Sequence, residues 1–77
     1  MKFLWKGENG LYLNAAMISG NASVMEWSNK YRVMIHQDNR FQPLAEFDNI
    51  EDAAKLQQKI NSWLEQFEYN EPLNIKE

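Results

Sequence analysis

The one histidine in this chain of 77 residues, His36, is the side chain best suited to acid–base chemistry near neutral pH. A nucleophilic triad would also need a serine in a sharp turn and a carboxylate behind the histidine. The four serines, at positions 19, 23, 28 and 62, lie in no such motif, and the three glycines match neither a phosphate loop nor a dinucleotide fingerprint. The sequence therefore predicts a protein that is not an enzyme and has no small-molecule substrate.

Metal chemistry has equally little support. The chain has no cysteine, which excludes disulfides, thiolate ligands and cysteine nucleophiles. Glu51 and Asp52 are neighbours on a predicted helix, so their carboxylates diverge instead of converging on one ion. We expect no metal site and no cofactor.

Nucleic-acid binding is suggested by basic residues that accompany Trp5, Trp27 and Tyr31 in the first half of the chain. The basic candidates are Lys2, Lys6, Lys30, Arg32 and Arg40. Aromatic stacking with cationic flanks is how single strands are held without sequence preference. An RNA-recognition strand aligned on Phe47 fails, because Phe41 stands where glycine is required. A nucleic-acid accessory protein is thus an alternative, against which stands a pI near 5.1.

Charge is unevenly distributed along the chain. Residues 1–40 hold five Lys/Arg against three Asp/Glu, whereas residues 41–77 hold three against eight. One interpretation is a helix with a solvated acidic face and an acidic tail; another is a bipolar surface that steers a charged partner. A third alternative is an acidic inhibitor that mimics nucleic acid through Glu51, Asp52, Glu65 and Glu68.

The elements expected to position these residues are mainly strands. Asn9-Gly10 predicts a turn in a first hairpin between residues 3–5 and 11–13. Residues 24–27, 31–36 and 41–47 favour strands, separated by the turn sequences "SNK" and "QDN", and Pro43 indicates an edge or a bulge. Residues 14–18 predict either a helical turn or the start of a third strand.

A helix after Phe47 is the clearest local feature. Asp48 or Asn49 can cap its first turn, and with Asp48 as the cap Glu51 completes a capping box. Pro72 excludes helix beyond about residue 70. Its apolar residues share one stripe, with Leu56 and Trp63 beside it: Ile50, Ala53, Ala54, Ile60, Leu64 and Phe67.

These elements predict an α+β fold, an antiparallel meander of four or five strands with one C-terminal helix packed on one face. The domain is expected to span residues 1–67, followed by an acidic tail at 68–77 that either docks as an extended strand or stays loose. Neither a signal peptide nor a membrane span is expected, so a soluble cytoplasmic protein is the prediction.

Strand alternation indicates where a partner would bind. Phe41, Ala45 and Phe47 share one parity and are expected to face the helix. Tyr31, Val33 and Ile35 on the preceding strand are expected to face it as well. The opposite face is predicted to leave an apolar band towards solvent unless sheet curvature, residues 14–23 or the tail cover it. The candidates for a protein interface or a homodimer are Leu4, Met25, Trp27, Arg32, Met34 and Leu44.

Taken together, the stretches "ENGLYLN", "YRVMI" and "LAEFDNIEDA" resemble a class of short, uncharacterised proteins of Gram-positive bacteria and their phages. The likeness covers roughly residues 3–67. It implies a small strand-rich domain with one helix and a phage or mobile-element context, and it carries no catalytic residue. Our leading prediction is therefore a non-enzymatic protein that binds another protein, or itself, through the uncovered sheet face or an edge strand.

Overall fold

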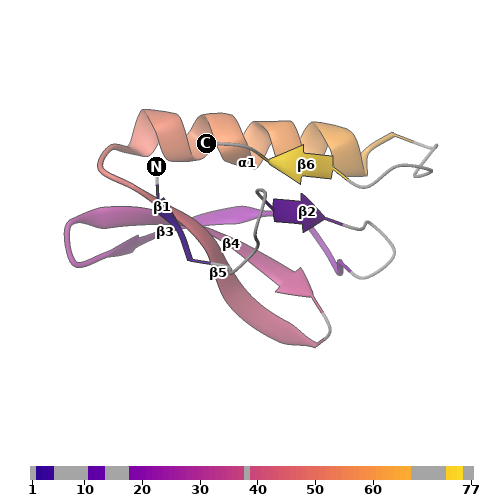
Figure 1. Ribbon diagram of the computed structural model, residues 1–77, viewed down its shortest axis with the longest axis horizontal. Helices are drawn as coiled ribbons and strands as arrows, with labels where there is room; N and C mark the ends of the chain where they lie inside the picture. Colours follow the sequence, from indigo (N-terminus) through magenta and orange to yellow (C-terminus); the bar gives the residue numbers. More distant parts are fainter. Residues whose placement is uncertain (1, 5–10, 14–17, 38, 67–72, 76–77) are drawn as a thin grey trace.

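The computed structural model describes residues 2–4, 11–13, 18–37, 39–66 and 73–75. Helix α1 runs along one face of an antiparallel sheet (Figure 1). The elements in chain order are β1 (Lys2–Phe3), β2 (Leu11–Leu13), β3 (Ser23–Trp27), β4 (Lys30–Gln37), β5 (Arg40–Phe47), α1 (Ile50–Leu64) and β6 (Leu73–Ile75).

The main sheet has the strand order β1-β5-β4-β3. Its long strands β3, β4 and β5 follow one another as a meander, and the two-residue β1 pairs antiparallel with the end of β5. The predicted α+β class, with an antiparallel sheet and one helix, is confirmed. The prediction of a four- or five-stranded meander is wrong, because only three consecutive strands form it in the described part of the chain.

The β3–β4 hairpin is closed by Ser28 and Asn29, whose φ angles are 48° and 62°. Positive φ at both central residues is the geometry of a type I′ turn, whose twist matches that of the paired strands. Asn tolerates the left-handed region better than most residues, so the predicted "SNK" turn is confirmed.

A bulge in β5 changes which side chains face the helix. Val33 pairs with Ala45 and Met34 pairs with Pro43, so Leu44 is an extra residue with no partner opposite it. An extra residue shifts the side-chain alternation by one. Leu44 therefore joins the core beside Ala45.

The same shift moves Phe41 away from the helix. Phe41 pairs with His36 on the opposite face and is 58% exposed, so the prediction that it packs in the core is wrong. Pro43 had indicated a bulge at this place, and the bulge lies beside it.

Helix α1 begins after Asn49, whose side-chain oxygen accepts a hydrogen bond from the N–H of Asp52 at 2.9 Å. The Asn49 amide donates back to the Asp52 carboxylate at 3.1 Å. Of the two predicted caps, Asn49 is the one used. The helix buries Ala53, Leu56, Ile60 and Trp63. Ile50 is exposed, so its assignment to the buried stripe is wrong, and Phe67 lies outside the described residues.

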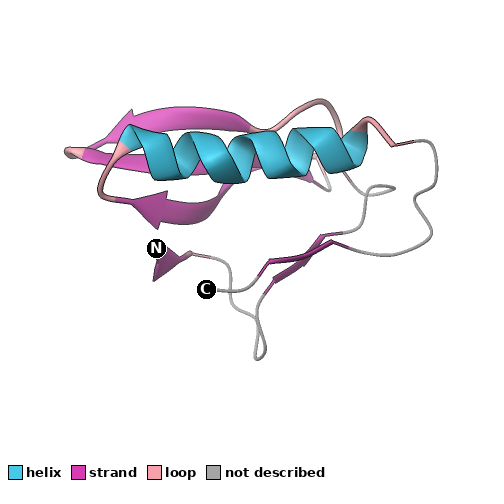
Figure 2. Ribbon diagram, turned by 90° about the horizontal axis from the view of Figure 1, so that it is seen from above, coloured by secondary structure: helices cyan, strands magenta, loops and turns pink. Residues whose placement is uncertain are grey.

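The short strands β2 and β6 form a ladder of their own, with Leu11 opposite Ile75. Figure 2 shows this ladder beside the helix and outside the main sheet. The predicted hairpin between residues 3–5 and 11–13 is therefore wrong for the described strands: β1 pairs with β5 and β2 with β6. The Asn9-Gly10 turn itself lies outside the described residues. Of the two alternatives for the tail, residues 73–75 adopt the extended strand.

One core joins the sheet, the helix and the β2–β6 ladder. Its members include Val33, Ile35 and Ala45 from the sheet, Ile60 from the helix and Ile75 from β6. None of the described helical residues forms a segment long and apolar enough to cross a membrane.

Candidate functional site

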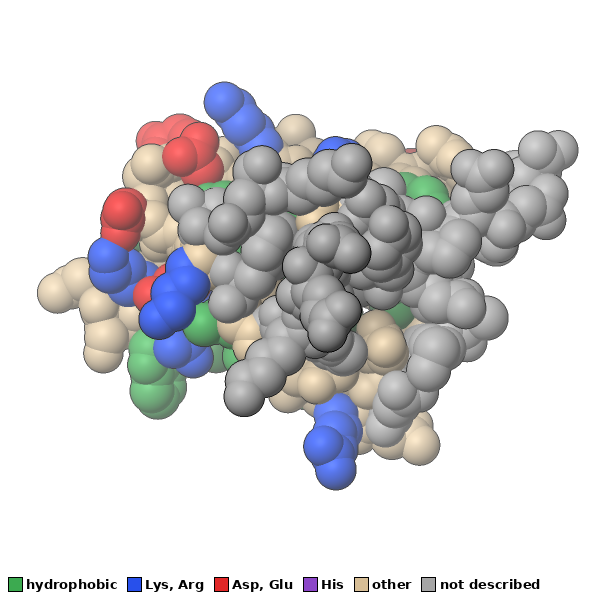
Figure 3. Space-filling model, in the orientation of Figure 1, with side chains coloured by type: hydrophobic (Ala, Val, Ile, Leu, Met, Phe, Trp, Pro, Cys, Tyr) green, Lys and Arg blue, Asp and Glu red, His purple; other side chains and the backbone are tan. Residues whose placement is uncertain are grey.

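The sheet face turned away from α1 carries an exposed aromatic residue near the β3–β4 hairpin. Trp27 pairs with Lys30 and Met25 pairs with Arg32, so all four side chains lie on one face. Trp27 is 54% exposed and Met25 is 36% exposed. We call these four residues the Trp27 surface. Figure 3 shows basic and apolar side chains adjoining at the end of the molecule where this hairpin lies.

Arg32 contacts both Trp27 and Glu46. The guanidinium carbon lies 5.4 Å from the centroid of the Trp27 ring, within range of a cation–π interaction. The Nε of Arg32 donates to a carboxylate oxygen of Glu46 at 2.9 Å, and both side chains are largely shielded from water. The Trp27 indole thus lies against a guanidinium that is hydrogen-bonded to Glu46, and it remains exposed.

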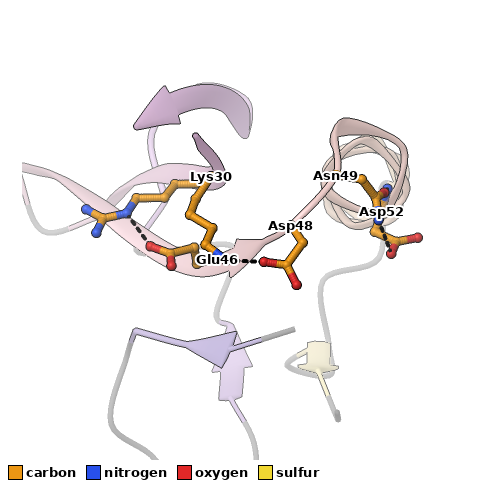
Figure 4. A network of polar contacts seen from close by, with 6 residues as sticks. Lys30, Glu46, Asp48, Asn49 and Asp52 are labelled. Atoms are coloured by element: carbon orange, nitrogen blue, oxygen red, sulfur yellow. Dashed lines mark hydrogen bonds and ion pairs between the residues drawn. The ribbon is translucent and has the colours of Figure 1, made fainter. Parts of the chain in front are cut away.

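Lys30, beside Trp27, forms an ion pair with Asp48 at the end of β5 (Figure 4). The hydrogen bond and the charge of Asp48 raise the pKa of Lys30, and those of Lys30 lower the pKa of Asp48. Both groups are exposed to solvent, so the pair adds little stability. Its consequence is electrostatic, because Lys30 is already neutralised by a carboxylate of its own chain.

Strand β3 forms one edge of the main sheet. The two-residue turn requires Trp27 and Lys30 to exchange backbone hydrogen bonds, and alternate residues of an antiparallel strand then direct their N–H and C=O groups away from the neighbouring strand. By this alternation the backbone N–H and C=O groups of Ala22, Val24 and Glu26 point away from β4. The outer side of β3 therefore offers backbone groups to whatever lies next to it.

The backbone groups of Ala22, the first of these residues, already have hydrogen-bond partners. Ala22 donates its N–H to the side-chain oxygen of Asn61 at 2.8 Å, and its C=O accepts from the amides of Gln57 at 3.1 Å and Asn61 at 3.3 Å. Within the described part of the chain, nothing similar meets the outward groups of Val24 and Glu26. We call the backbone of these two residues the open edge.

The opposite side of the sheet is closed over part of its length. β1 pairs with β5 at Ala45 and Glu46, and the N–H of Leu4 donates to the C=O of Leu44 at 3.0 Å. Pro43, which immediately precedes Leu44 on the same strand, has no N–H to offer. The open edge of β3 is therefore the more complete template for a further strand.

The other predicted interface residues are placed differently from Trp27 and Met25. Leu4 is half-buried beside β5. Met34 is 4% exposed and Leu44 is fully buried, so the expectation that both face solvent is wrong. Leu44 is turned into the core by the bulge, and Met34 is flanked in the central strand by its cross-strand neighbours Ser23 and Pro43. The accessible part of this face lies towards its ends.

The predicted nucleic-acid residues do not form one cluster of unpaired cations in the described part of the chain. Arg32 and Lys30 share a face with Trp27, but each is paired with a carboxylate. Lys2 lies on the same face, opposite Glu46. Arg40 pairs with Gln37, whose alternation places it on the other face. Lys6 lies outside the described residues.

Polar groups with catalytic or ligating chemistry are sparse. The Nδ1 atom of His36 and the side-chain oxygen of Gln37 are buried and have no partner in the described structure. Among the described residues, no three His, Asp or Glu side chains lie close enough together to hold a metal ion. The chemistry available near the Trp27 surface is therefore aromatic, apolar and backbone hydrogen bonding.

Sequence reasoning missed two features of the site. The contact of Gln57 and Asn61 with Ala22 has no sequence signature, since both look like solvated helix residues. The pairing of Arg32 with Glu46 becomes visible only with the register that the bulge sets. Pro43 indicated a bulge in this strand. It did not indicate that the bulge would change which side chains of β5 face the helix.

Comparisons with known proteins were made on three levels. No family model matches the chain, and no match was found among curated proteins or among solved structures. The function must therefore be argued from the geometry of the Trp27 surface and the open edge.

Proposed function

We propose that this protein is a non-enzymatic interaction module that binds a protein segment along β3, with the Trp27 surface as the anchor. One observation carries the proposal: Trp27 is 54% exposed, and its ring lies 5.4 Å from the guanidinium carbon of Arg32, which is itself hydrogen-bonded to Glu46. Tryptophan and arginine are the residues most enriched among those that dominate binding energy at protein interfaces. A pre-positioned aromatic ring also loses less conformational entropy when a partner covers it.

The adjoining edge of β3 supports the same proposal. A strand added to a sheet gains affinity from main-chain hydrogen bonds and specificity from alternate side chains. Next to β3, such a strand would meet the open edge with its backbone. Its side chains on one face would lie beside Met25 and Trp27.

The test compares partner capture by the wild-type protein and by Trp27→Ala, each immobilised and exposed to an extract of the organism that carries the gene. Truncation of a central tryptophan is expected to lower the affinity for each specific partner by roughly 30-fold or more. Ile50→Ala is the control, because Ile50 is exposed at the start of α1, which packs on the other face of the sheet, and its truncation should change nothing. Circular dichroism checks that both variants fold. Equal capture by Trp27→Ala and wild type would refute the proposal.

A second candidate is binding of single-stranded nucleic acid, favoured by the position of Lys30 and Arg32 on the same face as Trp27. It predicts fluorescence quenching of tryptophan by an oligonucleotide, with an affinity that falls steeply as salt rises. The leading proposal predicts neither. The two ion pairs argue against this candidate, because both cations are neutralised within the chain.

Mimicry of nucleic acid would use Glu51, Asp52 and Glu65, which are exposed, and Glu68, which lies outside the described residues. A cytoplasmic location and an origin in Gram-positive bacteria or their phages are likewise predictions.

A further inference from the structure

We infer that the strand that occupies the open edge is β3 of a second copy of this chain, paired antiparallel about a two-fold axis at Met25. The inference rests on the proposed function, whose partner it names. In this arrangement Val24 of each copy lies opposite Glu26 of the other. Because these are the two residues of β3 that direct backbone groups outward, each copy donates and accepts two hydrogen bonds. The edge is thus complementary to itself.

The structure selects this register among the symmetric ones. Moving the axis to Glu26 would place two Glu26 carboxylates directly opposite each other, which is unfavourable. Moving it to Val24 would place Glu26 opposite Ala22, whose N–H and C=O are already bound by Asn61 and Gln57. The register centred on Met25 avoids both conflicts.

Side chains on the two faces fit the same register. Met25 meets Met25 of the second copy at a non-hydrogen-bonded pair, the closer type of cross-strand contact. The unbranched Met side chain adapts to such a contact. Trp27 lies opposite Ser23 of the second copy, whose small side chain leaves room for the indole. On the helix side, Glu26 lies directly opposite Val24, and the two Glu26 side chains are diagonal neighbours instead of facing each other directly.

Electrostatics does not oppose the contact, although each chain carries a net charge of −3. The cations nearest the axis, Arg32 and Lys30, are paired within each copy with Glu46 and Asp48. Screening at physiological salt reduces the interaction of exposed charges farther apart than about 8 Å. A short strand contact of this kind belongs to the small, weak interfaces, and we expect a dissociation constant of roughly 10–1,000 µM.

Single-cysteine variants test the register directly, because the chain has no native cysteine. In Met25→Cys the two cysteines face each other at the axis, where their Cα atoms are about 4.5 Å apart. This lies within the Cα separation of about 4.4–6.8 Å that a disulfide requires. Glu26→Cys is the matched control: it is exposed on the same strand, but its counterpart in the second copy is offset diagonally by two residues, beyond about 7 Å. After equilibration in a glutathione buffer, disulfide-linked dimer is measured by mass spectrometry.

We expect at least about ten times more linked dimer from Met25→Cys than from Glu26→Cys. Equal yields would indicate random collision and would overturn the inference. A larger yield from Glu26→Cys would place the axis elsewhere and would overturn it as well.

Sedimentation equilibrium supplies a second test without cysteine. Glu26→Pro removes an outward N–H and keeps the ladder with β4, since proline is tolerated at a strand edge whose N–H faces solvent. Wild type and Glu26→Ala should dimerise at millimolar concentration, while Glu26→Pro stays monomeric. A wild-type protein that is monomeric at that concentration overturns the inference. The proposed function would survive that result, because its own test reads the capture of other proteins and fails only if Trp27→Ala binds them as wild type does.

Discussion

At the scale of single residues, polar contacts tie the helix to the backbone at the edge of the sheet. Asn61 and Gln57 both contact the backbone of Ala22 just before β3. Ala22 is buried, so its N–H and C=O would be costly to leave without partners. The two carboxamides thus act as a short substitute for a neighbouring strand. They also mark where the edge of the sheet is closed and where it begins to be open.

Removing the Asn61 side chain, which makes two of the three hydrogen bonds with Ala22, should lower the stability of the protein. Asn61→Ala leaves the buried N–H of Ala22 without its acceptor, and we expect the free energy of unfolding to fall by about 1–3 kcal/mol. Urea denaturation followed by tryptophan fluorescence measures it. Gln58→Ala is the control, because Gln58 is an exposed carboxamide on the same helix with no hydrogen bond in the described structure. Equal midpoints for the two variants would show that the contact with Ala22 is not stabilising.

At the scale of elements, local patterns predicted most of the described secondary structure. The strands around "SNK" and the helix after Phe47 follow from alternation, turn residues and a capping asparagine. Partners of the short strands were not predictable, because two or three residues carry too little pattern to choose between β5, β2 and β6. The bulge at Leu44 was not predictable in its effect either, since one extra residue reverses the parity of all that precedes it in β5.

The residues of the candidate site also differ in whether local sequence determines their orientation. Trp27 and Met25 lie in a strand whose register is set by a two-residue turn, and their exposure agrees with the sequence prediction. Met34 and Leu44 depend on the bulge and on neighbours from other strands, and both are buried. Sequence reasoning therefore succeeded where a local turn determines orientation.

The start of the helix gives a prediction at this scale, since the sequence allowed either Asp48 or Asn49 as its cap. Asn49→Ala is expected to lower the free energy of unfolding by about 1 kcal/mol, because it removes the acceptor for the N–H of Asp52. Asp48→Ala, which removes only an exposed ion pair with Lys30, should cost less. Urea denaturation of both variants distinguishes them. The opposite order would assign the cap to Asp48.

At the scale of the whole molecule, the main sheet and helix are joined by a strand from the far end of the chain. Ile75 in β6 is 2% exposed and belongs to the same core as the central strands. A chain of this length has a stability of only about 4–12 kcal/mol, so each buried aliphatic side chain is a large share of it. Residues 73–75, for which the sequence allowed either a docked extended strand or a loose tail, are thereby part of the fold.

Ile75→Ala tests whether that strand stabilises the domain. Truncation of a buried isoleucine is expected to cost about 2–5 kcal/mol, through lost burial and the cavity left behind. Ile50→Ala makes the same chemical change at an exposed position and should stay within about 0.5 kcal/mol of wild type. Urea denaturation gives both values. If the two variants unfold at the same urea concentration, β6 contributes nothing to stability; a large loss for Ile75→Ala alone means that the main sheet and helix depend on a strand formed by the last residues of the chain.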